Sequence, residues 1–310
     1  MTINVGVIGC GKRFNELYIQ VLELLVKEKK INLKIAYNRN ISHLSHLTEK
    51  FNCKLTSDIK DIIENVEVDL IIITVPINLR NKIIIQKNFN PKLLLLEVPF
   101  SNNLGEYYFL KKKLIDKGIK FEVFEDRFFF KKYNFKNKVF KYVVNFNKEW
   151  KHHAIGALFN IDNKSKYLKK IRYYNNLIKD FDVYKLTTNK LSLLYIFSSD
   201  KKKANREKGF IKIYDQEGQR TEVKEKDYDR IKNLNDGQSS LYICIENFLQ
   251  NPNLNHVYSY EFLEAEQIIV TMMKLMKKLK IKKVNKLSII VIKNLFKIYG
   301  SLIDYGKRLV

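Results

Sequence analysis

Short aliphatic runs alternate with helical segments along residues 1–125, and this alternation restricts the possible fold more than any other feature. The runs are apolar along most of their length, which is typical of strands buried on both faces of a sheet. They cover residues 3–8, 33–37, 69–75, 92–97 and 120–124. Intervening segments such as 15–27 and 104–117 space their apolar residues as amphipathic helices do. This order predicts an α/β domain whose parallel sheet is covered by helices on both faces.

After about residue 125 the pattern changes. Segments 139–146, 171–174, 183–188, 191–197 and 210–214 read as strands joined by turns, and segments 241–249, 260–279 and 287–309 read as helices. Strands followed by helices predict an α+β domain. We therefore expect one domain over residues 1–125 and a second over residues 126–310.

The net charge of +24 admits two explanations. A polyanionic partner, such as a nucleic acid or an anionic membrane face, would suit a cationic protein. The alternative is compositional, because Lys, Asn, Ile, Tyr and Phe are abundant throughout, as an A+T-rich genome encodes. We favour the compositional explanation and expect no nucleic-acid partner, although the charge suits a small anionic ligand such as a phosphate-bearing cofactor.

Nothing in the sequence predicts export or a membrane span. No apolar run approaches the roughly 20 residues that a spanning helix needs, and the N-terminal segment lacks the basic flank of a secretory signal. Cys10, Cys53 and Cys244 are too few and too far apart for a disulfide framework or a metal site. We expect a cytoplasmic protein.

The segment VGVIGCGKRF places Gly9 and Gly11 between the first strand and the first helix. Glycines at this spacing permit a tight turn and let backbone N–H groups approach a pyrophosphate at the helix N-terminus. Phe14 stands where a third glycine would complete the dinucleotide-binding pattern. We expect the phosphates of a dinucleotide to lie along this turn, which Lys12, Arg13 and Phe14 would line together with the glycines.

The second strand ends in AYNRN, so Asn38 and Arg39 follow it. An acidic residue at this place binds the ribose 2′-hydroxyl of NAD, whereas an arginine accommodates the 2′-phosphate of NADP. We therefore expect Asn38 and Arg39 to hold the adenosine end of the cofactor, with NADP(H) favoured over NAD(H).

Five segments in register, VGVIGCGKRF, AYNRN, IIITVPINLR, LLLLEVPFS and FEVFEDRFFF, resemble those of the Gfo/Idh/MocA family of oxidoreductases. The resemblance implies a Rossmann-type domain followed by an α+β domain with a large open sheet, which is a usual surface for homo-oligomers (dimers or tetramers) in this family. It implies an NAD(P)-dependent oxidoreductase of a small carbonyl or hydroxyl substrate, usually a sugar derivative. It also places Val75, Pro76 and Glu97 beside the nicotinamide half of the cofactor.

Two positions in the first domain depart from the family's chemistry. The E-K-P motif of the family falls on Glu97-Val98-Pro99, so the lysine that helps to move the proton of the reacting group is replaced by Val98. The histidine of the family's T-P-N-x-x-H segment is replaced by Arg80. A valine has no proton to transfer, so the resemblance leaves the proton source open.

The second domain departs from the family as well. KHHAIGALF offers His152 and His153, but Gly156 stands where the family motif has an aspartate. Substrate contact and proton supply would then fall to His153, His152 and Arg80, with Tyr18 as a further candidate. Of these groups, histidine titrates closest to neutral pH.

Three functions remain open on the sequence. A sugar oxidoreductase with a rearranged site agrees with the family's usual substrates, and Arg80 would then polarise a carbonyl. An imine or tetrapyrrole-type reductase agrees with the missing lysine, which biliverdin reductases and thiazoline-imine reductases also lack. A non-catalytic relative that retains the fold and the nucleotide agrees with the loss of several chemical groups at once.

Overall fold

The computed structural model of the chain describes residues 2–42, 44–125 and 231–252, the strands between residues 141 and 223, and separate positions from 263 to 295. The chain forms two compact units. Unit 1 consists of Met1–Asn102, Glu106–Asp126 and Asp229–Tyr260, and unit 2 consists of Asn103–Gly105, Arg127–Tyr228 and Glu261–Val310.

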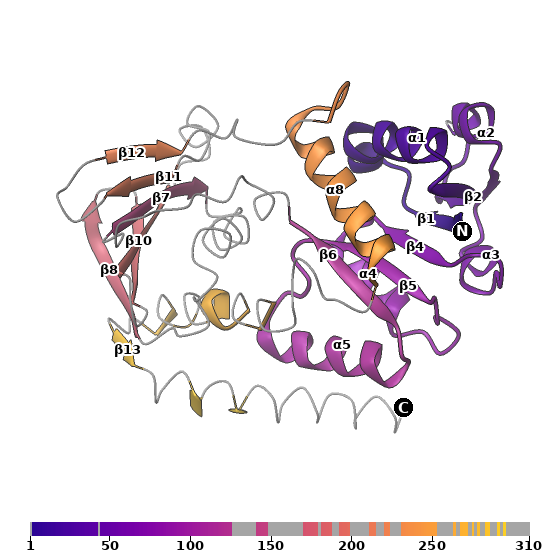
Figure 1. The fold of residues 1–310 in the computed structure, drawn as a ribbon. Coiled ribbons are helices and arrows are strands. Elements are labelled where there is room, and N and C mark those ends of the chain that lie inside the picture. The colour runs from indigo at the N-terminus through magenta and orange to yellow at the C-terminus, as the bar shows by residue number, and fades with distance from the viewer. Residues whose placement is uncertain are drawn as a thin grey trace. The chain divides into compact units, whose positions relative to one another are not determined.

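A six-stranded parallel sheet forms the centre of unit 1 (Figure 1). Its strands are β1 (Ile3–Ile8), β2 (Ile31–Tyr37), β3 (Lys54–Thr56), β4 (Leu70–Ile73), β5 (Leu93–Glu97) and β6 (Lys120–Phe124). The order across the sheet is β3-β2-β1-β4-β5-β6, and every neighbouring pair is parallel. The strand order therefore reverses between β1 and β4, which is where open sheets of this kind bind ligands.

Helices cover both faces of this sheet. They are η1 (Phe14–Tyr18), α1 (Ile19–Lys27), α2 (Ser45–Phe51), α3 (Lys60–Ile63), α4 (Ile77–Ile84), α5 (Leu104–Asp116) and α8 (Asp236–Gln250). Figure 1 shows α1 and α8 over one face and α5 over the other. The inner strands β4 and β5 are buried at every position, as their continuous apolar sequence predicts. The predicted α/β fold with a parallel sheet is confirmed.

The helix after β4 begins directly after a proline. α4 occupies Ile77–Ile84, and Pro76 precedes it with φ −52° and ψ 146°. Proline favours a helix start, because it lacks the N–H that the first turn would leave unsatisfied. Arg80 consequently lies inside a helix, with its side chain buried.

A helix from much later in the sequence packs on unit 1. The sequence assigned residues 126–310 to one domain, whereas the contacts place Asp229–Tyr260, and with it α8, in unit 1. Gln238 donates from Nε2 to the carbonyl of Glu16 at 3.2 Å. Lys30 donates to the Tyr242 hydroxyl and to the Glu246 carboxylate, which lies 216 residues away in sequence. Contacts between residues so far apart produce no local sequence pattern, so the assignment of α8 to unit 1 could not be predicted from the sequence.

Asn235 begins α8 with a capping box. Its side chain accepts a hydrogen bond from the N–H of Gln238 at 3.0 Å, and Oε1 of Gln238 accepts one from the N–H of Asn235 at 3.0 Å. We expect Asn235→Ala to lower the free energy of unfolding by about 1 kcal/mol. Asn90→Ala, at an exposed position, should change it by less than about 0.5 kcal/mol. Urea unfolding measures both, and equal effects would show that the cap does not stabilise the protein.

Unit 2 contains a seven-stranded mixed sheet. Its strands are β7 (Lys141–Asn147), β8 (Lys170–Ile178), β9 (Phe181–Thr187), β10 (Ser192–Ser198), β11 (Ile211–Tyr214), β12 (Arg220–Val223) and β13 (Lys283–Asn285). The order is β12-β11-β7-β10-β9-β8-β13, in which β7 and β10 are parallel and the other pairs antiparallel. This sheet agrees with the predicted α+β domain. In the part of the chain that the structure describes, no helix is both long and apolar enough to cross a membrane.

Candidate functional site

The turn after β1 joins the ends of three strands at Gly9. Its N–H donates to the carbonyl of Tyr37 at the end of β2, at 2.9 Å, and its carbonyl accepts a hydrogen bond from the hydroxyl of Thr74, just after β4. Gly9 has φ +102°, and a Cβ there would lie 2.5 Å from Cγ1 of Val75. Glycine alone combines this backbone conformation with such a close approach.

The space that a side chain would occupy is empty at Gly11, whereas it is filled at Gly9. A Cβ added at Gly11 would meet no atom within 4 Å, and the helix begins directly afterwards at Lys12. The first N–H groups of a helix have no partner within the helix, and they favour an anion. The turn therefore combines backbone donors with space beside Gly11, which is what a phosphate requires.

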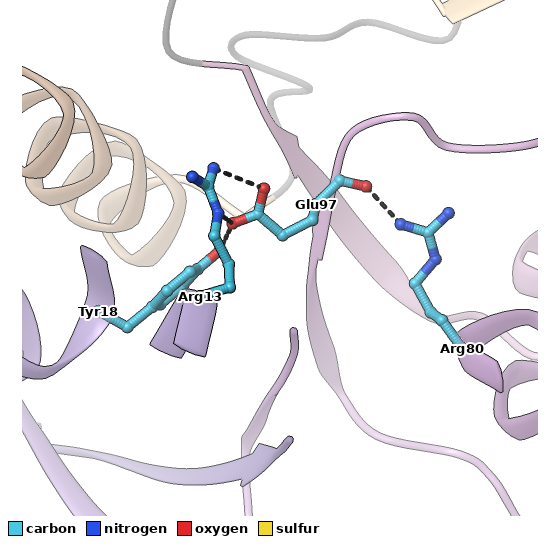
Figure 2. A network of polar contacts seen from close by, with 4 residues as sticks. All are labelled: Arg13, Tyr18, Arg80 and Glu97. Carbon is cyan, nitrogen blue, oxygen red and sulfur yellow. Dashed lines mark hydrogen bonds and ion pairs between the residues drawn. The ribbon is translucent and has the colours of Figure 1, made fainter. Parts of the chain in front are cut away.

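Glu97, at the carboxyl end of β5, is the centre of a polar network that reaches this turn (Figure 2). Arg13 donates to its carboxylate twice, from Nε at 3.1 Å and from Nη2 at 3.0 Å. The hydroxyl of Tyr18 donates to the same carboxylate at 2.6 Å. Glu97 is 9% exposed, so these bonds are largely shielded from water. A bidentate arginine and a tyrosine fix the carboxylate in one orientation.

Tyr18 is fully buried, and its ring stacks on Phe14 with the centroids 6.4 Å apart. Both residues belong to the π-helical turn η1, a geometry that is frequent at functional sites. Burial, and after it the charge of Glu97, raise the pKa of the Tyr18 hydroxyl well above its ordinary value, so it remains a donor. The side chain of Phe14 belongs to the core, and Phe14 can line a phosphate only through its backbone.

Tyr18→Phe should lower the free energy of unfolding by about 2 kcal/mol, because it removes a buried hydrogen bond to a charged group. The pKa of Tyr18 is raised in the folded protein, so its contribution is complete below the ordinary tyrosine pKa of about 10 and declines above it. The stability difference between wild type and variant should therefore shrink as pH rises past that value. Chemical unfolding across alkaline pH measures this, with Tyr37→Phe as the control; a pH-independent difference would contradict the assignment.

Arg80 lies on the other side of Glu97; both of its Nη atoms donate to backbone carbonyls, and its Nε donates to Oδ1 of Asn81 at 3.3 Å. The residue is 1% exposed, and it donates from Nη1 to the carbonyl of Glu97 and from Nη2 to the carbonyls of Pro99 and Phe100, the last at 2.8 Å. Burial lowers the pKa of Arg80 to about 10, which leaves the guanidinium charged at neutral pH. The sequence predicted a substrate contact for Arg80, whereas the structure gives it contacts with the turn after β5.

Two arginines thus hold the acid at the end of β5 from opposite sides, as Figure 2 shows. Arg13, from the segment after β1, binds the carboxylate of Glu97, and Arg80, from the helix after β4, binds its backbone carbonyl. The segments that follow β1, β4 and β5 are therefore tied together where the strand order reverses. Such a network can hold Glu97 and Val98 in place against a bound ligand.

The loop after β2 and the start of the first helix carry the predicted cations. The side chain of Asn38 donates to the carbonyl of Asn40 at 2.8 Å, so it shapes the loop, and Arg39 beside it is exposed. The side chain of Lys12 is 86% exposed, and its Nζ lies 3.7 Å from a carboxylate oxygen of Glu16. Exposed cations at these places suit an anionic ligand.

Some of the other predicted site residues lie in the described part of the structure and others do not. Val75 and Pro76 lie between β4 and α4, after Thr74, and Val98 is partly buried. His152 and His153 lie outside the described residues, so their catalytic role stays a prediction. Among the residues that the structure does describe, no group of His, Cys, Asp and Glu could hold a metal ion.

Two features of the site were not predicted. The only sequence signal for the bond from Thr74 to Gly9 was a hydroxyl residue directly after a buried strand. The pairing of Arg13 with Glu97 joins residues 84 positions apart, and no local pattern indicates it.

Comparison with known proteins finds one family model that resembles the first domain. The family model GFO_IDH_MocA, described as an oxidoreductase family with an NAD-binding Rossmann fold, matches residues 3–124. No curated protein matches the chain. The family that the sequence motifs indicated is thus supported over the first domain.

Solved structures share the fold over most of the chain. An oxidoreductase from Thermotoga maritima has a TM-score of 0.68 at 15% identity, with 93% of this chain and 100% of that chain covered. The WlbA dehydrogenase from Bordetella pertussis, in complex with NADH and UDP-GlcNAcA, has a TM-score of 0.66 at 13% identity, with 92% and 99% covered. GenD2 from gentamicin A biosynthesis, in complex with NAD, has a TM-score of 0.65 at 10% identity, with 92% and 96% covered. At these identities the likeness establishes the fold.

Proposed function

We propose that the protein, whose residues 3–124 match the family model of NAD-binding Gfo/Idh/MocA oxidoreductases, is an NADP(H)-dependent oxidoreductase of a small carbonyl or hydroxyl compound, with a sugar derivative as substrate. The observation that carries the proposal is the turn at Gly9 and Gly11, which has free space beside Gly11, lies at the reversal of strand order and leads to Arg13, the partner of Glu97. The same place in open α/β sheets binds dinucleotides.

The residues of the turn suit such a cofactor. Gly9 lets the backbone pass close to β4, and the empty space beside Gly11 leaves room for a phosphate. The N–H groups at the helix start would bind that phosphate, and Lys12 adds positive charge. A nicotinamide dinucleotide supplies hydride transfer when bound. Glu97, held by Arg13 and Arg80, would border its nicotinamide half.

Arg39 supports a preference for the 2′-phosphorylated cofactor, because it is an exposed cation where NAD-binding domains carry an acid. The neighbours crystallised with NADH or NAD support a nicotinamide dinucleotide in general. The preference for NADP(H) over NAD(H) therefore rests on a residue of this chain, whereas the neighbours support only a nicotinamide dinucleotide in general.

Thermal unfolding with NADPH, NADP⁺, NADH and NAD⁺ tests the cofactor, because a ligand that binds only the folded state raises the midpoint. At a ligand concentration about 100 times Kd the stabilisation is about 2.7 kcal/mol. We expect the phosphorylated pair to give the larger shift, and Arg39→Asp to abolish that advantage, while Lys87→Asp, which puts an aspartate in place of an exposed cation elsewhere in unit 1, leaves it intact. Equal shifts with NADPH and NADH would refute the preference, and no shift with any dinucleotide would refute the cofactor.

A sugar-derivative substrate agrees with the neighbour that holds UDP-GlcNAcA. The proton would come from His152 or His153 or from solvent, because Val98 has none to transfer and Arg80 is occupied by backbone carbonyls. NADPH oxidation with a panel of keto-sugars tests this substrate class.

The protein would act as a homo-oligomer, a dimer or a tetramer.

One observation favours a second function. The partly buried Val98 makes the position of the family's lysine apolar, which agrees with imine or tetrapyrrole-type reductases that lack this lysine. Cyclic imines in the same NADPH assay distinguish the two, because turnover of an imine without turnover of any keto-sugar would favour the second function.

A further inference from the structure

The positive charge of the chain is concentrated toward its C-terminus. Residues 272–310, here called the C-terminal segment, contain eleven Lys and Arg residues and a single acid, Asp304, a net charge of +10 out of +24 for the whole chain. Residues 1–125 contain nineteen Lys and Arg against fourteen acids. A lysine-rich composition explains many lysines everywhere, but it does not explain a segment almost devoid of acids.

The same segment exposes apolar side chains. Leu279 and Leu295 are each 59% exposed, Val291 is 49% exposed and Ile290 is 43% exposed. Single exposed apolar residues are normal on a soluble protein. Several exposed apolar side chains within one short segment indicate a surface that binds a protein or a membrane.

The pattern of residues 286–298 is that of an amphipathic helix, and the described positions 290, 291, 294 and 295 are helical. Lys286, Lys293 and Lys297 recur in the sequence at i, i+7 and i+11, a spacing that would place them on one stripe of a helix through this segment. Val291 and Leu295 are four residues apart and fall on a different face. A helix with lysines on one face and aliphatic residues on the other is typical of proteins that lie in a membrane interface.

We propose that the C-terminal segment binds the surface of an anionic lipid bilayer, with Val291 and Leu295 entering the interface and the lysines contacting acidic headgroups. Charge complementarity selects this partner, because juxtamembrane basic clusters bind anionic lipid and the apolar face gains from burial in acyl chains. A nucleic acid would use the lysines but would leave the aliphatic side chains in water. A second copy of the chain would bring two segments of charge +10 together. This contact is peripheral and independent of the proposed oxidoreductase activity.

Co-sedimentation of the full chain with vesicles tests the proposal. We expect binding to vesicles that contain phosphatidylglycerol, weaker binding as salt increases, and none to vesicles of phosphatidylcholine alone. Each lysine removed among Lys286→Gln, Lys293→Gln and Lys297→Gln should weaken binding about fivefold. Val291→Asp with Leu295→Asp should weaken it at least tenfold, because apolar area is no longer buried.

Matched variants in unit 1 provide the controls. Val66 is 91% exposed and Ile115 is 52% exposed, so Val66→Asp with Ile115→Asp adds the same charges to exposed apolar positions elsewhere and should leave vesicle binding unchanged. No binding to anionic vesicles would overturn the proposal. Binding that Val291→Asp with Leu295→Asp leaves intact would overturn it too, since it would indicate only a general affinity for polyanions. If sedimentation velocity shows that the double variant dissociates an oligomer while lipid binding is absent, the face is covered by a second copy.

Discussion

Arg80→Met is expected to lower the free energy of unfolding by about 3–5 kcal/mol, because it removes the hydrogen bonds that a buried charged donor makes to three backbone carbonyls. Methionine fills much of the space of the arginine stem but donates no hydrogen bond. The carbonyls of Glu97, Pro99 and Phe100 would lose the guanidinium that binds them. An unsatisfied buried polar group costs about 1–3 kcal/mol, so the loss of several bonds accounts for the size of the effect.

Urea unfolding of Arg80→Met measures this effect, and Arg39→Met is its control because Arg39 is exposed. The control should change stability by less than about 0.5 kcal/mol. Arg80→Lys should recover only part of the loss, because a single ammonium group cannot reproduce the planar fork that reaches several carbonyls. An Arg80→Met variant as stable as the wild type would contradict the role of Arg80 as the residue that positions the turn after β5.

Gly11→Ala should leave the fold intact and weaken dinucleotide binding at least tenfold, about 1.4 kcal/mol. The new methyl group would meet no atom of the chain within 4 Å, so stability should change by less than about 0.5 kcal/mol. The methyl would instead occupy the space in which we place the phosphates, and the second glycine of the turn is the one that permits the backbone to approach them.

Gly9→Ala provides the contrast for this prediction. A Cβ there would lie 2.5 Å from Cγ1 of Val75, and the backbone is at φ +102°. Strain of this kind costs about 1–3 kcal/mol before the clash is counted, so Gly9→Ala should destabilise the protein where Gly11→Ala does not. Fluorescence titration with NADPH, together with urea unfolding, separates the two. If Gly11→Ala bound NADPH as tightly as the wild type, the phosphates would not lie at this turn.

The first sheet could be predicted from the sequence because each strand can be recognised from the apolar pattern of its own residues. β4 and β5 are buried at every position, and the continuous aliphatic runs at residues 70–73 and 93–96 predict this without reference to distant residues. The turn at Gly9 is also local, since a positive φ and a close approach both demand glycine there. These are the parts of the site that the family resemblance and the residues themselves predicted alike.

The contacts of the charged side chains could not be predicted in the same way. Arg80 was expected to face a substrate because its position in the family motif carries a histidine, yet its side chain is 1% exposed and bonded to backbone. Arg13 was expected to line phosphates, yet its guanidinium also pairs with Glu97, 84 residues away. Both outcomes depend on which strand ends become neighbours, and that is settled by the packing of the whole sheet.

The central claim is that a nicotinamide dinucleotide binds at the turn between β1 and the first helix. Calorimetric titration of the wild-type protein with NADPH and, separately, with NADH tests it most directly. We predict saturable binding to a single class of sites, tighter for NADPH than for NADH. An absence of binding by either dinucleotide, with the protein shown to be folded, would contradict the claim and leave a chain that has this fold without its cofactor.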